Sequence, residues 1–419
     1  MIEMISTKII IGDSRKMPEV QNNSIDLIVT SPPYWHIKDY GIEGQIGYDQ
    51  SLHDYLKNLY IVWEECFRVL RPGTRLCINI GDQFLRSIIY GRYKIAPIHS
   101  EFIAQCEKIG LDYMGAIIWQ KKTTMNTTGG ATVMGSYPYP PNGLIEIDYE
   151  FILIFKKPGK REVSKELKEK SKLSKEEWKE YFLSHWHFPG EKQIDHEAMF
   201  PEELPKRLIK MFTFVGDTVL DPFLGSGTTV KSALNLNRNS TGYEINEQFL
   251  TVINKKLEIN TVLKDPDKNI EIIKRDKSTK ISTKTDYSPT IKDSNPLVSP
   301  AKFKFKKEQL YKAVEVQSED MIKLDTDLII KLLGIKVPFE KSDKAKRYLE
   351  EYVKGKQVSI KFDPLFAPEK DIVPAYVFLK NKIFINKEMI KQKLAEIPPQ
   401  NFRYKSNFIK SKAGYEQDS

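Results

Sequence analysis

The tetrapeptide Ser31-Pro32-Pro33-Tyr34 has the residue types needed to hold an exocyclic amine. It follows the apolar run from Ile25 to Thr30, which predicts a buried strand. Two prolines cannot continue a central strand, so the chain leaves the sheet in a stiff conformation that fixes the Ser31 hydroxyl and the Pro32 carbonyl. These two acceptors can take both protons of an –NH2 group and turn its lone pair toward an electrophile, while Tyr34 stacks on the attached ring. The alternative is a Pro-Pro turn that only ends the strand.

A second stretch, Val219 to Thr229, has the pattern of a strand, a glycine turn and the first turn of a helix. Apolar residues lead into Asp221, glycines follow at 225 and 227, and Thr228-Thr229 opens a helical pattern. Because glycines have no β-carbon, a ligand can approach the backbone N–H groups at the helix N-terminus. The stretch therefore predicts a site for a nucleotide-like ligand. No lysine directly follows the glycines, which argues against an ATP-binding P-loop.

The run from Ser240 to Glu244 predicts the next strand, and it ends in an acid. An acid about twenty residues after a glycine turn is well placed to accept hydrogen bonds from both hydroxyls of a bound ribose. Glu244 is therefore a candidate ligand-binding residue.

Strands and helices alternate over the first two thirds of the chain, which predicts an α/β sheet with helices on both faces. The expected strands are 7–12, 25–30, 76–80, 114–119, 150–155, 219–221 and 240–244. The expected helices are 51–73, stopped by Pro72-Gly73, then 100–110, 202–212, one that begins at Thr228 and a last one through 249–257.

Two further segments are open to two interpretations each, and one histidine is considered with them. The Gly/Pro-rich loop 122–143 is expected near the substrate, or is a disordered surface insertion. The Lys/Glu-rich segment 157–184 is expected as a helical hairpin whose basic residues could meet phosphates, or as a plain surface insertion. His196 has no Ser, Cys or acid at a triad spacing, so a structural role is expected for it.

Taken together, the sequence TSPPYW at 30–35 and the later sequence DPFLGSGTT at 221–229 resemble the S-adenosylmethionine-dependent DNA amino-methyltransferases. The order, with the tetrapeptide before the cofactor loop, is the circularly permuted order of the beta class. The resemblance covers about residues 7–260, with weaker motifs at Gly12-Asp13, 68–70, Trp119, 196–205 and Glu244. It implies a Rossmann-like methyltransferase sheet.

The resemblance also implies roles for individual residues. Glu244 would bind the ribose of S-adenosylmethionine, and Asp13 and Phe200-Pro201 would flank its adenine. The acid at position 221 suits the positive ammonium end of this ligand. The methionine part would be lined by the loop residues Asp221, Pro222, Phe223, Gly225, Ser226, Gly227, Thr228 and Thr229.

Serine at the first position of the tetrapeptide is, in this family, typical of cytosine-N4 methylation, whereas adenine-N6 enzymes more often carry Asp or Asn there. No side chain is placed to form a covalent adduct with the base, so Ser31 and the Pro32 carbonyl would localise the amine lone pair for direct transfer. The target amine is inaccessible in a duplex, so the base must flip out and stack on Tyr34.

Composition agrees with a nucleic-acid partner and sets other limits. The chain has 419 residues, 40% of them hydrophobic, and a net charge of +9, which suggests a polyanionic partner or only a lysine-rich solvated surface. The cysteines at 66, 77 and 106 are expected as buried thiols in a reducing compartment, and no spacing predicts a metal site. No apolar stretch approaches about 18 residues, so a soluble cytoplasmic protein is expected.

The C-terminal part predicts a separate domain. Residues 1–262 are expected as the methyltransferase domain, 263–304 as a polar linker and 305–419 as a strand-rich domain compatible with an OB-like β-barrel. This last part resembles a staphylococcal-nuclease-like domain, with Asp320 where that family has a calcium ligand. Its other catalytic positions are changed, since Lys331, Lys336 and Phe339 replace an arginine, a metal ligand and the general base. An inactive domain that contacts DNA or another partner, or only packs, is expected.

The leading hypothesis is therefore a site-specific DNA methyltransferase that acts on double-stranded DNA, with or without a cognate restriction endonuclease. One alternative keeps the fold but gives it an adenine-N6 or RNA target. Another is a non-catalytic nucleic-acid-binding protein with a vestigial catalytic fold. DNA sequence specificity is expected in the 122–143 loop, the 157–184 segment or the C-terminal domain.

Overall fold

A computed structural model describes residues 4–35, 41–42, 44–48, 50–85, 90, 94–121, 139–142, 145, 147–190, 200–262, 265–275, 285–292, 294, 298, 302–303, 310–363, 365–369 and 371–416. His196 and most of the 122–143 loop lie outside these residues. The chain divides into two compact units. The first comprises Met1–Tyr48, His53–Gln83 and Pro97–Ile291; the second comprises Asp49–Leu52, Phe84–Ala96 and Lys292–Ser419.

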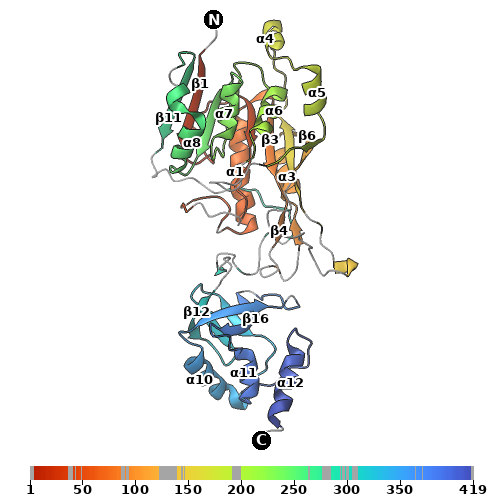
Figure 1. The fold of residues 1–419 in the computed structure, drawn as a ribbon, viewed down its shortest axis with the longest axis vertical. Coiled ribbons are helices and arrows are strands. Elements are labelled where there is room, and N and C mark those ends of the chain that lie inside the picture. Colours follow the sequence, from red (N-terminus) through yellow and green to blue (C-terminus); the bar gives the residue numbers. More distant parts are fainter. Residues whose placement is uncertain are drawn as a thin grey trace. The chain divides into compact units, whose positions relative to one another are not determined.

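The first unit is built on a nine-stranded sheet in the order β11-β1-β10-β9-β2-β3-β7-β6-β8 (Figure 1). Its strands are β1 (Ile5–Ile11), β2 (Ile25–Thr30), β3 (Leu70–Ile80), β6 (Asp112–Gln120), β7 (Tyr149–Lys156), β8 (His185–His187), β9 (Thr218–Asp221), β10 (Asn239–Glu244) and β11 (Lys268–Lys274). The six strands from β11 to β3 run parallel, and β7 is antiparallel to both of its neighbours.

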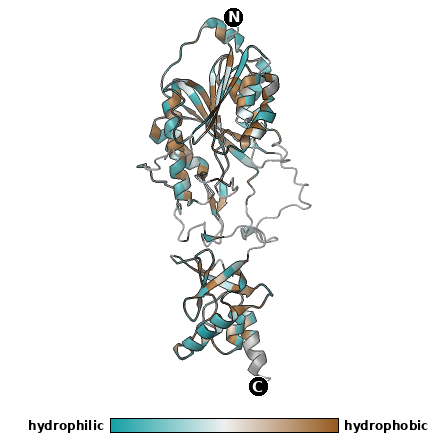
Figure 2. Cartoon of the chain, turned by 90° about the vertical axis from the view of Figure 1, so that its left-hand side faces the viewer, coloured by the Kyte–Doolittle hydropathy of each residue, from teal (hydrophilic) through white to brown (hydrophobic). Residues whose placement is uncertain are grey.

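Helices lie on both faces of this sheet (Figure 2). The helices of this unit are α1 (Leu52–Val69), α3 (Ile98–Ile109), α4 (Lys165–Lys170), α5 (Lys175–Tyr181), α6 (Glu203–Phe212), α7 (Thr228–Asn235), α8 (Phe249–Leu257) and α9 (Ile259–Val262). Successive strand residues point to opposite faces. Leu27 and Val29 pack in one cluster with α6, whereas Ile28 between them is buried on the other face. The predicted α/β sheet covered on both faces is confirmed.

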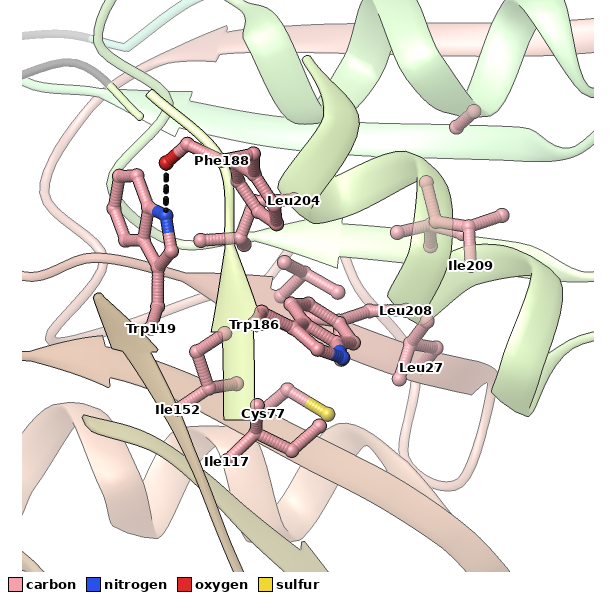
Figure 3. Close-up of a cluster of buried hydrophobic side chains, with 13 residues drawn as sticks. Leu27, Cys77, Ile117, Trp119, Ile152, Trp186, Phe188, Leu204, Leu208 and Ile209 are labelled. Atoms are coloured by element: carbon pink, nitrogen blue, oxygen red, sulfur yellow. Dashed lines mark hydrogen bonds between the residues drawn. The ribbon is translucent and has the colours of Figure 1, made fainter. Parts of the chain in front are cut away.

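The cluster under α6 contains two of the largest buried side chains of the core, Trp119 and Trp186 (Figure 3). Trp119 of β6 and Trp186 of β8 are 1% exposed, and the Trp119 indole N–H donates to the Phe188 carbonyl at 3.0 Å. Leu204 and Leu208 of α6 close the cluster from above the sheet. The cluster therefore fixes the antiparallel strands β6 and β7 and the short strand β8 against the parallel part of the sheet.

The helix expected over 51–73 is shorter than predicted, because α1 ends at Val69 and β3 begins at Leu70. Pro72-Gly73 lies inside the strand, where the pairing with β2 shifts between Leu70 and Arg75. A proline without an N–H donor and a glycine with φ of 85° both suit such a bulge. The pair therefore interrupts a strand instead of ending a helix.

The predicted linker 263–304 is wrong for Lys268–Lys274, which form edge strand β11 beside β1. Residues near 287 are also anchored in the first unit. The Tyr287 ring stacks on Tyr60 of α1 at 4.4 Å, and its phenol donates to Glu101 of α3, which also accepts from the Thr290 hydroxyl at 2.8 Å. The polar composition of this segment did not predict these contacts, because they depend on only one aromatic ring and one buried carboxylate.

In the second unit, five strands close into a barrel in the order β12-β13-β14-β16-β15. They are β12 (Tyr311–Val316), β13 (Met321–Leu324), β14 (Ile329–Leu332), β15 (Gln357–Phe362) and β16 (Ile372–Leu379). The helices are α10 (Ser342–Tyr352), α11 (Ile385–Lys391) and α12 (Lys405–Glu416). The buried Asn386 of α11 ties that helix to the barrel, since its amide donates to the Leu333 carbonyl at 2.9 Å and accepts from Val377 N at 2.8 Å.

Replacing Tyr287 by alanine is expected to destabilise the first unit. The change removes the stacked ring, which is 5% exposed, and one donor to the buried Glu101. Loss of a buried aromatic side chain costs about 3 kcal/mol. Urea unfolding of the full chain measures this, with Tyr139→Ala as the control because Tyr139 is 69% exposed. Equal stability of the two variants would contradict the anchoring of this segment.

Candidate active site

The carboxyl ends of four neighbouring parallel strands bring most of the predicted site residues to one edge of the sheet. Asp13 follows β1, Glu244 ends β10, Asp221 ends β9 and the tetrapeptide 31–34 follows β2. In the register of these strands, Ile11 is paired with Glu244 and Gly242 with Asp221. The chain passes from β2 through α1 to β3 on one side, and from β9 through α7 to β10 on the other. Ligands of open α/β sheets bind at such a divergence.

Asp221, at the end of β9, is hydrogen-bonded to the end of β2 at this divergence. One oxygen of its carboxylate accepts from the Thr30 hydroxyl at 2.8 Å and from Phe223 N at 3.0 Å, and the other accepts from the Thr229 hydroxyl at 2.7 Å. The side chain is 1% exposed, and burial raises the pKa of the Asp221 carboxyl to about 6. Thr30, the last residue of β2, was not among the predicted site residues.

The loop after Asp221 turns through two glycines in the left-handed region, Gly225 at φ 54° and Gly227 at φ 91°. Gly227 is the N-cap of α7. The loop is also attached to β10, because Leu224 N donates to the Tyr243 carbonyl at 2.8 Å and Gly225 N donates to the Glu244 carboxylate at 2.9 Å. The sharp turn therefore requires glycine, and the loop and Glu244 form one unit.

Glu244 accepts a second backbone hydrogen bond from Asn246 N at 2.8 Å. Burial raises the pKa of its carboxyl to about 7, and the nearby Asp221 carboxylate acts in the same direction. A buried acid, Asp221, and a partly buried acid, Glu244, thus lie at the ends of adjacent strands. A ligand that presents hydroxyl or ammonium donors to this edge would be bound well.

The hydroxyls of Ser226 and Thr228 lie 3.2 Å apart, and both accept from the ammonium group of Lys256 of α8, at 3.0 and 2.6 Å. The sequence interpretation missed Lys256. The position of Lys256 in the sequence does not predict this contact, because the contact joins the glycine loop to a helix that follows the next strand. The glycine loop is thus held by β10 on one side and by α8 on the other.

Asp13 is held by its own chain. Its carboxylate accepts from Arg15 N at 2.9 Å and from the Arg15 guanidinium, which also bonds to Asn58 of α1 and to the Gly44 carbonyl. Both Arg15 and Asn58 were missed by the sequence interpretation. Arg15 follows Asp13 by only two residues, so this contact could have been predicted from the sequence, since Asx turns join near neighbours along the chain.

The tetrapeptide is fixed at two points. The Pro33 carbonyl accepts from the Tyr55 phenol of α1 at 3.0 Å, and the Tyr34 phenol donates to Glu150 of β7 at 2.5 Å. Burial raises the pKa of Tyr34 well above its ordinary value, and the adjacent Glu150 carboxylate raises it further. Pro32 is buried, whereas Ser31 is partly exposed at the edge of the sheet. Glu150 was not predicted as a site residue.

Phe200 and Pro201 directly precede Glu202, the N-cap residue of α6. Phe200 packs against the apolar cluster of Figure 3, and the Pro201 carbonyl accepts from Leu204 N at 3.0 Å. Phe223 packs edge-on against Trp63 of α1, with ring centroids 6.3 Å apart. These are packing contacts, and the predicted ligand contacts of Phe200, Pro201 and Phe223 stay predictions.

Neither a metal cluster nor a membrane span occurs within the described ranges. No group of three or more His, Cys, Asp or Glu residues in the described part of the chain could hold a metal ion. The helices of those ranges are all too short or too polar to cross a lipid bilayer. Cys66, Cys77 and Cys106 are buried free thiols, as predicted.

Comparison with known proteins gives one consistent family. A family model described as DNA methylase matches residues 25–255. The Type II methyltransferase M.MjaI of Methanocaldococcus jannaschii is 40% identical over 298 residues, which cover 64% of this chain and 96% of that protein. The Type II methyltransferase M.MthZI of Methanothermobacter thermautotrophicus is 34% identical over 282 residues, 61% of this chain and 77% of the relative.

A solved structure agrees with these sequence matches. The crystal structure of a putative DNA modification methylase from Thermus thermophilus, complexed with S-adenosyl-L-methionine, is 34% identical with a TM-score of 0.50. The match covers 64% of this chain and 99% of that chain.

The raised pKa of Glu244 predicts a pH-dependent stability. Because the folded state keeps this proton up to pH about 7 and the unfolded state loses it near the ordinary value of 4.5, the folded state binds more protons between these values. The free energy of unfolding should therefore fall by up to about 3 kcal/mol as the pH rises from about 5 to about 8.

Urea unfolding at several pH values measures this dependence. Glu244→Gln cannot titrate at this position, so its stability should fall less steeply over the same range than that of the unaltered chain. Identical slopes for the two proteins would show that Glu244 has an ordinary pKa.

Proposed function

The chain belongs to the DNA methylase family and is a DNA methyltransferase, and from that premise we propose that it methylates the exocyclic N4 amine of cytosine. Its methyl donor is S-adenosylmethionine. The observation that carries the proposal is the tetrapeptide 31–34 at the end of β2, directly beside the glycine loop at the end of β9. Serine, not an acid or amide, stands at its first position.

The proposed cofactor site uses the acids and the loop of the same edge. The ammonium group of the donor would meet the Asp221 carboxylate, the loop 222–229 would enclose the methionine part, and Glu244 would accept from the ribose hydroxyls. The raised pKa values of Asp221 and Glu244 support this, since each carboxylate has lost solvation and gains from a positive or hydroxyl donor. Asp13 and Phe200-Pro201 would flank the adenine.

The proposed reaction is a direct displacement. The N4 lone pair of cytosine is delocalised into the ring and is a poor nucleophile. The Ser31 hydroxyl and the Pro32 carbonyl accept from the amine and localise that lone pair, and the amine attacks the methyl carbon in line with the departing sulfur. The C–S bond breaks as the N–C bond forms, and the amine then loses one proton to solvent. Orientation of the two reactants supplies much of the rate.

The substrate is double-stranded DNA, and the target base flips out of the duplex to stack on Tyr34. The relatives named as Type II methyltransferases support a role in a restriction-modification system with a cognate restriction endonuclease. An adenine N6 amine could be held by the same pair of acceptors, so adenine is the second candidate base.

For the second unit we propose a staphylococcal-nuclease-like, OB-type barrel that contacts DNA without cleaving it. The five-stranded closure with α10 between β14 and β15 supports this fold. Lysines at 331 and 336 suit phosphate groups but not a calcium site, and Phe339 is 93% exposed. The Asp320 carboxylate accepts from the Ser318 hydroxyl at 3.0 Å.

Replacement of Ser31 by alanine should lower methyl transfer by about 100-fold or more, because one of the two acceptors on the amine is lost. Binding of S-adenosylmethionine should persist, since Ser31 is not in the cofactor loop. Transfer of a tritiated methyl group to unmethylated genomic DNA, followed by nucleoside analysis, measures rate and product together.

The expected product is N4-methylcytosine. Finding N6-methyladenine instead would move the proposal to the second candidate base. A Ser31→Ala variant that methylates at the unaltered rate would contradict the mechanism. A chain that transfers no methyl group would contradict the proposed activity.

The inactive-nuclease proposal is tested separately. The full chain incubated with DNA and calcium should release no fragments, whereas staphylococcal nuclease in the same buffer serves as the positive control. Metal-dependent cleavage that disappears in Asp320→Ala would refute the proposal.

A further inference from the structure

The carboxylate of Glu150 receives three donors although it is almost fully buried. Glu150 is 6% exposed. Its Oε1 accepts from the Tyr34 phenol at 2.5 Å and from the Lys121 ammonium group, and its Oε2 accepts from the Asn79 side-chain amide at 2.6 Å. A buried carboxylate is tolerated only when it is paired and hydrogen-bonded, so these three donors are what permits its burial.

The sheet brings the donors together from separate parts of the chain. Asn79 is near the end of β3, Glu150 is the second residue of β7, and Lys121 follows β6. The register pairs Asn79 with Ile152 and Trp119 with Glu150, which sets these residues side by side at the edge that carries the tetrapeptide. Tyr34 is the only donor of the three that belongs to the tetrapeptide.

The backbone at Gly81 leaves room for this arrangement. A β-carbon at position 81 would lie 3.3 Å from the Glu150 Cγ and 3.8 Å from the Tyr34 Cε1. The first distance is tighter than ordinary contact, so a side chain here would press on the glutamate. The Tyr34 ring is thus bordered by bare backbone on one side and tied by its phenol at the tip.

We propose that Glu150 is a positioning residue for the target base, because its carboxylate holds the Tyr34 phenol and thereby sets the plane of the ring on which the base stacks. The proposal rests on the proposed function, in which Tyr34 stacks on the flipped base. A ring held in one orientation before the base arrives reduces the ordering needed in the reactive complex.

Lys121 balances the negative charge of Glu150. Its ammonium group neutralises Glu150 and lies 5.1 Å from the centre of the Trp119 ring. A cytosine presents acceptor atoms at N3 and O2, which an unpaired carboxylate would repel. The pair presents no net charge to the base, so the carboxylate can fix Tyr34 without repelling the ring that Tyr34 receives.

A purely structural role would give a different result. In that case the cluster would only hold β3 and β7 together, and its loss would lower stability without changing the chemistry of the folded fraction. The same unit contains a matched pair for comparison, since the buried Glu101 accepts from the phenol of Tyr287. That pair fixes a peripheral segment and is not part of the tetrapeptide.

The experiment compares Glu150→Gln, Tyr34→Phe and the double variant with Glu101→Gln and Tyr287→Phe. The readouts are kcat with tritiated S-adenosylmethionine and saturating unmethylated genomic DNA, KM for S-adenosylmethionine, and the melting temperature. Tyr34→Phe and Glu150→Gln should each lower kcat by about 10- to 100-fold with KM for the cofactor unchanged. The double variant should be no slower than the slower single one, because both changes remove one interaction.

The control pair should lower the melting temperature and leave kcat unchanged. Tyr34→Phe with an unaltered kcat would overturn the proposal, and it decides alone if Glu150→Gln does not fold, since it removes only one oxygen atom. Additive losses in the double variant would also overturn it. If the unaltered chain transfers no methyl group, the proposed function fails; if it is active and both single variants are equally active, only the role of Glu150 fails.

Discussion

The hydrogen bond between the Thr30 hydroxyl and the Asp221 carboxylate is the contact on which the geometry of the candidate site depends. It joins the ends of β2 and β9, the adjacent strands from which the chain diverges to opposite sides of the sheet. The tetrapeptide begins one residue after Thr30 and the glycine loop begins one residue after Asp221. Because the bond is buried, its strength is not reduced by competition with water. The distance between the two loops is therefore set by the sheet.

Three carboxylates lie along this edge, with Asp221 and Glu150 buried and Glu244 partly buried, and each accepts from a different set of donors. Asp221 uses two hydroxyls and a backbone N–H, Glu244 uses two backbone N–H groups, and Glu150 uses a phenol, an amide and a lysine. The pKa of the Asp221 carboxyl is about 6 and that of the Glu244 carboxyl is about 7. Glu150 is paired with the ammonium group of Lys121. Acids concentrated in this way lower the folding stability but raise the affinity of the site for ligands that donate hydrogen bonds.

Sequence patterns predicted the parts of this molecule that depend on neighbours along the chain. The strands, the glycine turn and the stiff tetrapeptide are local, and the sheet with helices on both faces followed from their alternation. The partners Glu150, Lys121 and Lys256 could not be predicted, because each contact joins elements that only the sheet order brings together. Strand β11 was missed for a related reason, since an edge strand buries little apolar surface and its composition resembles that of a linker.

The position of β1 has a consequence for synthesis of the chain. This strand leaves the ribosome before both of its partners, since it pairs on one side with β10, which begins at Asn239, and on the other with β11, which ends at Lys274. Pairing of β1 with either strand requires the closure of a very long loop, which is slow compared with pairing between strands that are near in sequence. A nascent chain that stops short of β10 holds Ser31 and Tyr34 but lacks Glu244. Only chains translated through nearly the whole first unit can therefore bring the two ends of this edge together.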